Sequence, residues 1–408
     1  MYEQSGTTDL APRPVHVPEA LVVDFDFYNP PGAEDDIQLA WKRIQEEYPP
    51  IFWTPHYGGH WVATHGEDIK TIQLEHERFS QSTMAIPLPV PPRPPSYPIN
   101  LDPPEQAPYR KLIMGAFLPK AINELTDTAR SLAISLIEDL APKGRCEFQN
   151  DFARVLPVVV FLKMMGLPLE DRRMLTPLAE TSVRDPDPHK KGEAQHAMAR
   201  YVEGWIEEAR KNPGSDLLSR VVTAEINGRA ITHQEQMSVS TLLLAGGLDT
   251  VASSMGFVAL FLAQNPNHRA RLRNDPAILP AAIEELLRRF IGTNTVRVIR
   301  YDFTYKGVDF KKGDIIQQSG LLYNLDEAIN ERPLEVDFDR QGSIQHVSFG
   351  SGVHTCPGQI LARREISVFI EEWLKRIPEF EVTPGTKPEL RTGMVNGVTE
   401  LQLSWPTS

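Results

Sequence analysis

Cysteine is nearly absent from this chain of 408 residues, which contains only Cys146 and Cys356. Two cysteines cannot form the disulfide framework of a small secreted protein, so a reducing compartment, the cytoplasm, is expected. The N-terminal sequence lacks a basic segment followed by an apolar one, and no stretch of about 20 residues is uncharged and apolar enough to span a membrane. The sequence therefore predicts neither secretion nor membrane anchoring.

Positively charged residues are fewer than negatively charged ones. The chain has 42 lysines and arginines and 54 aspartates and glutamates, which gives a net charge of -12. Nucleic-acid binding depends on clustered lysine and arginine, so a nucleic-acid partner is not expected. Low-complexity segments and internal repeats are lacking as well. The composition is typical of a soluble globular protein, which we expect to be a monomer that binds small neutral ligands or protein partners.

Apolar residues recur at three- and four-residue spacing in several long segments, and this pattern predicts amphipathic helices. The segments are 121–141, 195–212, 232–266 and 278–290. Shorter runs bounded by turn residues predict small sheets at 56–66, 296–316 and 398–405. The predicted fold class is therefore mainly α with small β-sheets.

The composition shows no break that marks a domain boundary, so we expect a loose N-terminal tail at 1–25 and a single domain at 26–408. Residues 85–106, "AIPLPVPPRPPSYPINLDPPEQ", are too rich in proline for a regular helix, because proline lacks the amide donor. This stretch predicts a long, stiff surface loop or a lid.

The segment "HVSFGSGVHTCPGQ" (346–359) places Cys356 in a glycine-rich turn before a helix-like run. Pro357 suits the first position of a helix, whose free amides lower the pKa of a nearby thiol. Glycines such as Gly350 and Gly358 allow the tight turn that brings amides close to sulfur. The pattern is that of a thiolate ready to bind a metal ion.

Two other interpretations of this cysteine exist. It could be an incidental residue in a glycine-rich turn. It could also form a zinc site with His346 and His354, although structural zinc sites mostly use four ligands with paired spacing, and a Cys-x-x-Cys pair is lacking.

Asp249 and Thr250 interrupt an otherwise apolar helical segment, just after Gly246 and Gly247. A buried acid and a buried hydroxyl cost free energy unless they are partnered or take part in chemistry. The alternative interpretation is close helix packing at the glycines, with the acid in a structural ion pair.

Glu285 and Arg288 stand three residues apart on one predicted helix face, where they can form a charge-assisted pair. A pair of this kind more often marks a solvated helix face.

The string Phe349-Gly350-x-Gly352-x-His354-x-Cys356-x-Gly358 resembles the haem-binding signature of cytochromes P450 at every fixed position. The resemblance implies haem b as the cofactor and Cys356 as the thiolate ligand of its iron. The turn residues would hold the haem, and the phenylalanine would shield the sulfur. The residues implied to contact haem are Phe349, Gly350, Gly358, and, at the propionates, His354, Arg110, Arg297 and Gln106.

The segments "GLDTV", "EELLRRF", "LARREI" and "DPPEQ" are similar to those of soluble bacterial P450s, in particular the camphor-hydroxylase family. The resemblance implies one roughly triangular haem-thiolate domain, with haem between a long distal helix and the cysteine loop. Thr250 and Asp249 would then serve O2 activation, as hydrogen-bond donor and proton relay. Glu285 and Arg288 would form a structural pair behind the cysteine loop.

Members of this family are monooxygenases that receive two electrons from NAD(P)H through a flavoprotein reductase and an iron–sulfur ferredoxin. An acidic ferredoxin would need a basic docking face near the cysteine loop. The candidate residues for this face are Lys70, Arg78, Arg110 and Arg363.

The resemblance also implies a substrate pocket lined by Ala85, Leu242, Ala245, Gly246, Thr293, Thr295, Met394 and Val395. The tyrosine that binds the camphor ketone corresponds to proline-rich sequence near Pro94, with Tyr97 displaced by a few residues. Thr295 stands where the camphor enzyme has a propionate-binding aspartate. These differences favour a compact apolar terpenoid, such as 1,8-cineole or an ionone, over camphor itself.

Two rival functions follow from the same signature. A peroxygenase would use H2O2 directly, but such relatives replace the acid–alcohol pair that this chain retains at Asp249 and Thr250. A haem-thiolate sensor or carrier would bind a ligand without turnover and would not need a proton relay.

Overall fold

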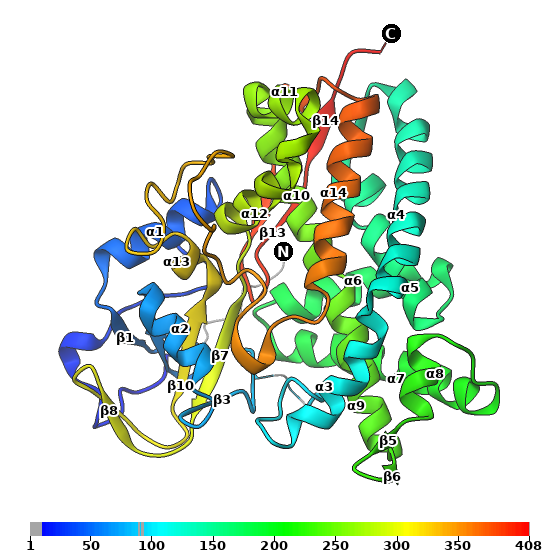
Figure 1. Ribbon diagram of the computed structural model, residues 1–408. Coiled ribbons are helices and arrows are strands. Elements are labelled where there is room, and N and C mark those ends of the chain that lie inside the picture. Colours follow the sequence, from blue (N-terminus) through cyan, green and yellow to red (C-terminus); the bar gives the residue numbers. More distant parts are fainter. Residues whose placement is uncertain (1–9, 89, 91–93, 408) are drawn as a thin grey trace, which may run out of the picture.

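The structure is a computed structural model that describes residues 10–88, 90 and 94–407. Helices dominate, and they gather on the right of Figure 1, while the largest sheet lies on the left. The mainly helical fold with small sheets, in a single domain, is as predicted. The helices are α1 (Ile37–Glu47), α2 (Gly66–Leu74), α3 (Gln106–Met114), α4 (Pro119–Leu140), α5 (Leu156–Met165), α6 (Arg172–Arg184), α7 (Pro188–Lys211), α8 (Leu217–Val222), α9 (His233–Gly247), α10 (Thr250–Gln264), α11 (Pro266–Asn274), α12 (Leu279–Phe290), α13 (Gly320–Asn324) and α14 (Gln359–Arg376).

The helical core forms where the apolar faces of α4, α10 and α14 meet. On α14, Phe369 and Trp373 are one turn apart and fully buried, so they lie on one apolar face of the helix. Their rings pack against those of Phe148 and Phe152, with centroid separations of 5.1 Å from Phe148 to Trp373 and 5.5 Å from Phe152 to Phe369. This aromatic cluster fixes the helix that begins directly after the cysteine loop.

Five strands form the largest sheet, in the order β1-β2-β10-β7-β3. Only β10 and β2 run parallel, and the other neighbours are antiparallel. Smaller sheets join β11-β14-β4, β12-β13, β5-β6 and β8-β9. The strands are β1 (Ile51–Thr54), β2 (His60–Ala63), β3 (Phe79–Ser80), β4 (Arg145–Glu147), β5 (Glu225–Ile226), β6 (Arg229–Ala230), β7 (Asn294–Ile299), β8 (Phe303–Tyr305), β9 (Val308–Phe310), β10 (Ile315–Ser319), β11 (Glu381–Val382), β12 (Glu389–Arg391), β13 (Gly397–Glu400) and β14 (Gln402–Ser404).

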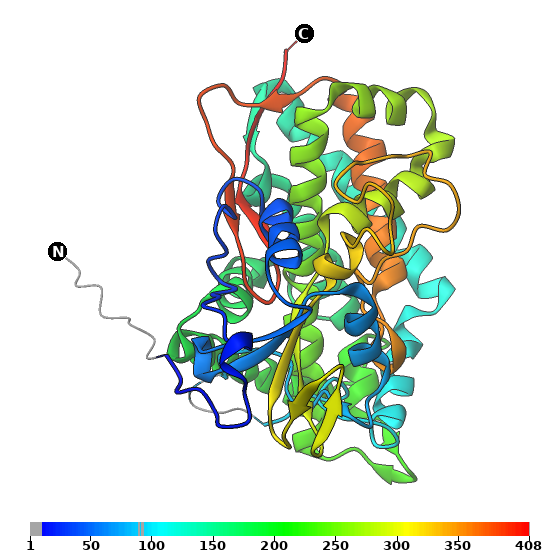
Figure 2. The same ribbon diagram turned by 90° about the vertical axis from the view of Figure 1, so that its left-hand side faces the viewer.

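The predicted loose tail at 1–25 is wrong for its later part, while residues 1–9 lie outside the described residues. Val17 and Phe25 are buried, and Val22 forms a bridge with Trp53 of β1. Figure 2 shows this segment in dark blue beside the sheet. The physical reason is apolar burial, since the tail supplies side chains that the edge of the sheet would otherwise leave exposed.

The proline-rich stretch is a loop, as predicted, in the part of it that the structure describes. The loop is held at two helices. Val90 N donates to Pro188 O of α7 at 2.9 Å, and Tyr97 N donates to Ser238 Oγ of α9 at 2.8 Å. It therefore spans from the start of α7 to the first half of α9.

One helical stretch of the described residues, His233–Gln264, is long and apolar enough to cross a membrane by length and composition. The sequence analysis did not single out this stretch, because Glu235 and Asp249 interrupt it with charge. Some 67% of its apolar window is buried inside the domain, which is typical of the core helix of a globular protein.

Candidate functional site

Cys356 lies in the turn between a short 3-10 helix (Gly352–His354) and α14. The turn is tight, as predicted, because Gly350 and Gly352 adopt φ angles of 67° and 71°, where L side chains are strained. Cys356 N donates to Phe349 O at 2.9 Å and closes the loop. A Cβ atom on Gly352 would lie 3.1 Å from Gln73 O, so the loop also packs closely on the end of α2.

The thiol of Cys356 accepts hydrogen bonds from the backbone amides of Gly358 and Gln359 at the start of α14. Burial raises its pKa, while these amides and the charges of Arg110 and Arg363 act in the opposite direction. The amides thus act in the predicted direction, but in the protein alone burial outweighs them and the pKa of the thiol is raised. A metal cation facing the sulfur would reverse the balance, because a coordinating thiol is deprotonated.

Phe349 is half-buried beneath Arg363, whose guanidinium lies 4.5 Å from the ring centroid. Nε and Nη2 of Arg363 also donate to the carboxylate of Glu284 on α12, at 2.6 and 2.8 Å. His346 Nε2 lies 2.9 Å from the same carboxylate. Burial opposes ionisation of Glu284, but these partners lower its pKa to about 2. His346 is therefore engaged away from Cys356. No group of three metal-ligating side chains gathers in the described part of the chain, which disfavours the zinc interpretation.

Two buried groups near the cysteine loop, Arg297 and His354, have no anionic hydrogen-bond partner in the part of the chain that the structure describes. Arg297 of β7 is only 4% exposed, and its Nη1 donates to the carbonyl of Val296 at 3.0 Å. Burial lowers its pKa to about 10. His354 Nε2 has no partner among the described residues, and burial, together with the charges of Arg297 and Arg110, lowers the pKa of His354 to about 4.

Gln106 and Arg110 stand one turn apart on α3 and both reach the cysteine loop. Gln106 Nε2 donates to Val353 O at 2.9 Å, and Arg110 Nη2 donates to Thr355 O. Burial lowers the pKa of Arg110, and negative charge on the sulfur of Cys356 acts in the opposite direction. The predicted residues of α3 therefore anchor the loop beside Arg297 and His354.

The haem that the signature implies fits this arrangement. A metal ion would meet the thiol of Cys356, and the propionates would supply the carboxylates that Arg297 and His354 lack. Buried Arg297 supports the fit most directly, because it has no ion-pair partner among residues 10–88, 90 and 94–407 and a buried charge is costly unless it is paired.

Replacing Arg297 by methionine is expected to speed the loss of haem by about 10- to 100-fold, because a hydrogen bond to a charged group contributes about 1.5–3 kcal/mol. The rate of haem transfer to excess apomyoglobin measures this. Arg300→Met is the matched control, since Arg300 is exposed and lies 3.6 Å from Asp102 at the surface. Equal rates for the two variants would contradict the assignment of Arg297.

The long apolar stretch is divided where Asp249 and Thr250 interrupt it. Helix α9 ends at Gly247 and α10 begins at Thr250, with Asp249 at φ -126° and ψ -37° between them. Thr250 Oγ1 donates to Gly246 O at 3.3 Å. A Cβ atom on Gly247 would clash with the ring of Phe161, whereas one on Gly246 would meet nothing within 4 Å. Gly247 thus allows close packing, and Gly246 borders open space at the helix break.

Asp249 is 6% exposed and forms a bidentate ion pair with Arg184 at the end of α6. Nη1 and Nη2 of Arg184 lie 2.7 Å from the two carboxylate oxygens. Arg184 Nη2 also donates to Ser253 Oγ, one turn further along α10. A Cβ atom on Gly397 would lie 2.6 Å from Arg184 Nη2, so β13 closes the ion pair from the other side. The ion pair that the alternative interpretation required is present.

The predicted pocket residues come from separate segments, and the structure brings several of these together. Thr293 forms a bridge with Val395, and Asn294 N donates to Met394 O at 2.8 Å. Thr295 Oγ1 accepts from Gln318 Nε2 at 2.6 Å, within the large sheet. Leu242, Ala245 and Gly246 lie on α9, and Ala85 lies at the start of the proline-rich loop.

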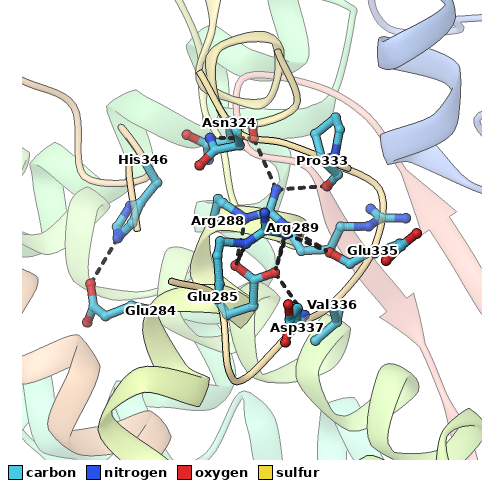
Figure 3. A network of polar contacts seen from close by, with 12 residues as sticks. Glu284, Glu285, Arg288, Arg289, Asn324, Pro333, Glu335, Val336, Asp337 and His346 are labelled. Carbon is cyan, nitrogen blue, oxygen red and sulfur yellow. Dashed lines mark hydrogen bonds and ion pairs between the residues drawn. The ribbon is translucent and has the colours of Figure 1, made fainter. Parts of the chain in front are cut away.

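Glu285 and Arg288 of α12 form the predicted pair, and both are fully buried (Figure 3). Arg288 Nε and Nη2 lie 2.7 and 2.8 Å from the Glu285 carboxylate, and Arg340 contributes two further bonds at 3.0 Å. Burial opposes ionisation of Glu285, but these bonds lower its pKa. The remaining N–H groups of Arg288 bind the carbonyls of Asn324, Pro333 and Glu335. A solvated helix face is thereby excluded.

Asn324 connects this pair to the cysteine loop, a link that the sequence analysis missed. Its carbonyl accepts from Arg288, its side-chain oxygen accepts from Val347 N at 2.8 Å, and its Nδ2 donates to Ser348 Oγ at 3.0 Å. The pair therefore lies behind the loop, as the resemblance implied, and holds its first residues in place.

The four predicted docking cations all have partners within the chain. Arg363 binds Glu284, and Arg110 binds the cysteine loop. Arg78 pairs with Glu75 and lies 5.3 Å from the Phe303 ring centroid, and Lys70 Nζ lies 3.5 Å from the Tyr323 hydroxyl. Their use by a ferredoxin remains a prediction.

Glu365 of α14 is a buried acid that the sequence analysis did not single out, and it is only 2% exposed. Burial raises its pKa to about 8. The sequence carried no signal for it, because its neighbours "ARREIS" resemble a solvated helix segment.

The folded protein therefore keeps Glu365 protonated, at a cost that grows as pH rises from about 4.5 towards about 8. We expect Glu365→Gln to raise stability by about 3 kcal/mol at pH 7 and to change it little at pH 4.5 or below. Urea midpoints measured from pH 4.5 to pH 8 test this. A variant with the same pH dependence as the parent would show that Glu365 does not bear this cost.

The sequence profile of the family described as Cytochrome P450 matches residues 183–403. A protein described as "Probable cytochrome P450 127A1" from Sinorhizobium fredii is 35% identical over 407 residues, which cover 97% of each chain. Nocardicin C N-oxygenase from Nocardia uniformis subsp. tsuyamanensis is 30% identical over 386 residues, which cover 91% of this chain and 96% of that protein.

Two solved structures are similar over almost the entire chain. The crystal structure of CYP101J2 matches with a TM-score of 0.88 and that of CYP101C1 with 0.86, each at 36% identity and each covering 97% of this chain and 100% of the other. Both belong to the camphor-hydroxylase family, which the sequence analysis expected. Together with the cysteine loop and the buried Glu285–Arg288 pair, these likenesses establish that the chain belongs to the cytochrome P450 family and is a P450 monooxygenase.

Proposed function

We propose that this monooxygenase hydroxylates small apolar terpenoids, such as 1,8-cineole, camphor or an ionone. Its electrons would come from NAD(P)H through a flavoprotein reductase and a ferredoxin, in the cytoplasm. The observation that supports this most is the apolar character of the pocket residues on α9, Leu242 and Ala245, next to the open space at Gly246. Thr295 adds little polarity, because its hydroxyl already accepts from Gln318. Such a pocket favours a hydrocarbon body.

Haem, when bound to Cys356, would supply the reductive activation of O2. The residues of this chain would hold the cofactor and deliver protons. The hydroxyl of Thr250 lies at the helix break, 3.3 Å from Gly246 O, and can turn from that carbonyl towards the open space to hold a proton at Oγ1. The thiolate side would be closed to water by the cysteine loop and Phe349.

Asp249 is the proposed source of these protons. Both carboxylate oxygens accept hydrogen bonds from Arg184 at 2.7 Å, so both are engaged while the ion pair is intact. One oxygen must leave Arg184 before Asp249 can carry a proton to Thr250. Ser253 Oγ, 3.3 Å from Asp249 Oδ2, is placed to keep the second oxygen in position.

The substrate class is tested by the spin shift of the Soret band on titration with 1,8-cineole, camphor, β-ionone and a fatty acid. We expect a low-to-high-spin shift with at least one terpenoid and none with the fatty acid. A shift with the fatty acid alone would refute the substrate class.

Turnover with ferredoxin, reductase and NADH should then give a hydroxylated product, whereas H2O2 without these partners should give little. Efficient turnover with H2O2 alone would favour a peroxygenase.

A further inference from the structure

A cleft of about 630 Å³ lies in a part of the domain that the proposed reaction does not use. It is bordered by the start of α1, the second half of α10, the end of α12 and the start of β12. Figure 2 shows α1, in blue, beside the red C-terminal strands. None of the described residues that line the cleft belongs to the cysteine loop or to the predicted substrate pocket. Its volume is in the range of sites that bind drug-sized molecules.

Three phenylalanine rings form an apolar wall of this cleft. Phe257 and Phe261 stand one turn apart on α10, and Phe290 is the last residue of α12. The ring centroid of Phe290 lies 6.4 Å from that of Phe257, with the two rings nearly parallel, and 5.4 Å from that of Phe261. Leucines from three further positions line the cleft, namely Leu260, Leu334 and Leu390. The cleft therefore offers an apolar surface that suits a molecule with a ring-based body.

Arg289, next to Phe290 on α12, also lines the cleft, and part of its guanidinium lacks acceptors. The residue is 8% exposed, and its Nε donates to Leu334 O at 2.7 Å. Nη1 is buried and has no hydrogen-bond partner within residues 10–88, 90 and 94–407, and the carboxylate nearest to Nη2 there is Asp36 Oδ2, at 3.9 Å. The guanidinium carbon lies 4.9 Å from the centroid of the Phe290 ring. Because Asp36 and Phe290 both line the cleft, the guanidinium between them lies at its wall.

The neighbouring Arg288 shows how a buried guanidinium is satisfied elsewhere on the same helix. Its N–H groups bind the Glu285 carboxylate and three backbone carbonyls. Arg289 has one backbone carbonyl in place of these four partners, and burial lowers its pKa. A buried donor without an acceptor costs free energy. The Nη groups of Arg289 are therefore available to an acceptor on a molecule that enters the cleft.

The charges of the lining residues favour one kind of acceptor. The carboxylates of the lining are Glu34, Asp35, Asp36 and Glu335, and its cations are Lys387 and Arg289. Asp35 is paired with Lys387, whose Nζ lies 2.6 Å from Asp35 Oδ1. An anionic ligand would meet the excess of negative charge, and a cationic ligand would meet Arg289. A neutral carbonyl oxygen avoids both repulsions and can accept hydrogen bonds from the guanidinium.

We propose that this cleft is a second ligand site, which binds a neutral molecule with a ring-based apolar body and a carbonyl oxygen that accepts hydrogen bonds from Arg289. The cleft shares no described residue with the predicted substrate pocket, so the proposal does not depend on the substrate class. Helix α10 begins at Thr250, and its second half lines the cleft. A molecule bound there would contact the same helix that holds the proposed proton donor.

Two probes that differ only at the carbonyl test the proposal. They are 4,4′-difluorobenzophenone and bis(4-fluorophenyl)methane, in which a CH2 group replaces the carbonyl. Fluorine NMR follows their binding to the haem-loaded protein while saturating 4-phenylimidazole fills the haem pocket. We expect the ketone to bind at one site and the hydrocarbon to bind about tenfold more weakly or worse, because the hydrocarbon leaves the N–H groups of Arg289 unpaired.

Arg289→Met is expected to weaken binding of the ketone by about 10- to 100-fold, the factor that a hydrogen bond to a charged group contributes, and to leave binding of the hydrocarbon unchanged. Leu260→Trp should weaken binding of both probes by about tenfold or more, because the larger side chain occupies the cleft. Arg271→Met is the matched control, since Arg271 lies on the adjacent helix α11 and pairs with Asp339 outside the cleft. Its affinities should equal those of the parent protein.

Equal affinities of the parent protein for the two probes, or no saturable binding of the ketone, would overturn the proposal. An Arg289→Met protein that keeps the parent affinity for the ketone would overturn it as well. Ketone binding that Leu260→Trp leaves unchanged would place the probe elsewhere, with the same consequence. If Arg289→Met does not fold, the two probes and Leu260→Trp still decide. The terpenoid titrations probe the haem pocket and not the cleft, so the two hypotheses fail separately.

Discussion

Thr250→Ala is expected to keep consuming NAD(P)H in the presence of substrate while most of the reducing equivalents leave as hydrogen peroxide. The hydroxyl of Thr250, at the helix break, is proposed to hold the proton that is needed for an oxygen atom to enter the substrate. Positioned proton donors contribute factors of about 10² to 10⁴ to a rate, so product formed per NAD(P)H should fall by about tenfold or more. Product, peroxide and NAD(P)H, measured together, give the coupling.

The controls for this variant lie within one helical turn. Thr250→Ser keeps a hydroxyl at the same position and should retain most of the coupling. Ser254→Ala removes a hydroxyl that donates to Thr250 O at 2.9 Å along α10, and it should leave coupling unchanged. Unchanged coupling in Thr250→Ala would refute the role of its hydroxyl, whatever the behaviour of the controls.

Arg288→Ala is expected to prevent the accumulation of folded, haem-loaded protein. The substitution leaves the buried Glu285 with Arg340 as its remaining cationic partner and removes the donors to the carbonyls of Asn324, Pro333 and Glu335, the first two of which are buried. Removing one partner of a buried pair costs about 3–5 kcal/mol, a large part of the stability of a typical domain. Because Asn324 ties this network to the cysteine loop, the loss should reach the haem site.

Arg271→Ala provides the exposed counterpart of this experiment. Arg271 forms a bidentate pair with Asp339 at 2.8 and 2.9 Å, but its side chain is 45% exposed and that of Asp339 is 63% exposed. Surface pairs contribute about 0–1 kcal/mol, so haem content and urea midpoint should stay near those of the parent. Arg288→Lys should behave like Arg288→Ala, because lysine cannot reproduce the guanidinium fork. A stable, haem-loaded Arg288→Ala protein would contradict the structural role of the pair.

Local chemistry made the cysteine loop predictable. Glycines at positive φ, a cysteine in a turn and an apolar stripe after it define that turn within 14 residues of sequence. The Glu285–Arg288 pair was predictable for the same reason, since a spacing of three places both side chains on one helix face.

Contacts between distant segments could not be predicted from spacing. Arg184 meets Asp249 across 65 residues, and β10 pairs with β2 across about 250. The choice between proton relay and structural ion pair therefore stayed open at Asp249, and Asn324 was missed. The buried segment 17–25 was mistaken for a loose tail, because Pro18, Glu19 and Asp24 interrupt the few apolar side chains that reach the core.

The central claim is that Cys356 ligates haem iron as a thiolate. The most direct test is the absorption difference spectrum of the dithionite-reduced protein with and without carbon monoxide. The account predicts the red-shifted Soret band of thiolate-ligated haem for the parent protein, and its replacement by the band of imidazole-ligated haem in Cys356→His. An imidazole-type band in the parent protein, or a red-shifted band that survives in Cys356→His, would contradict it.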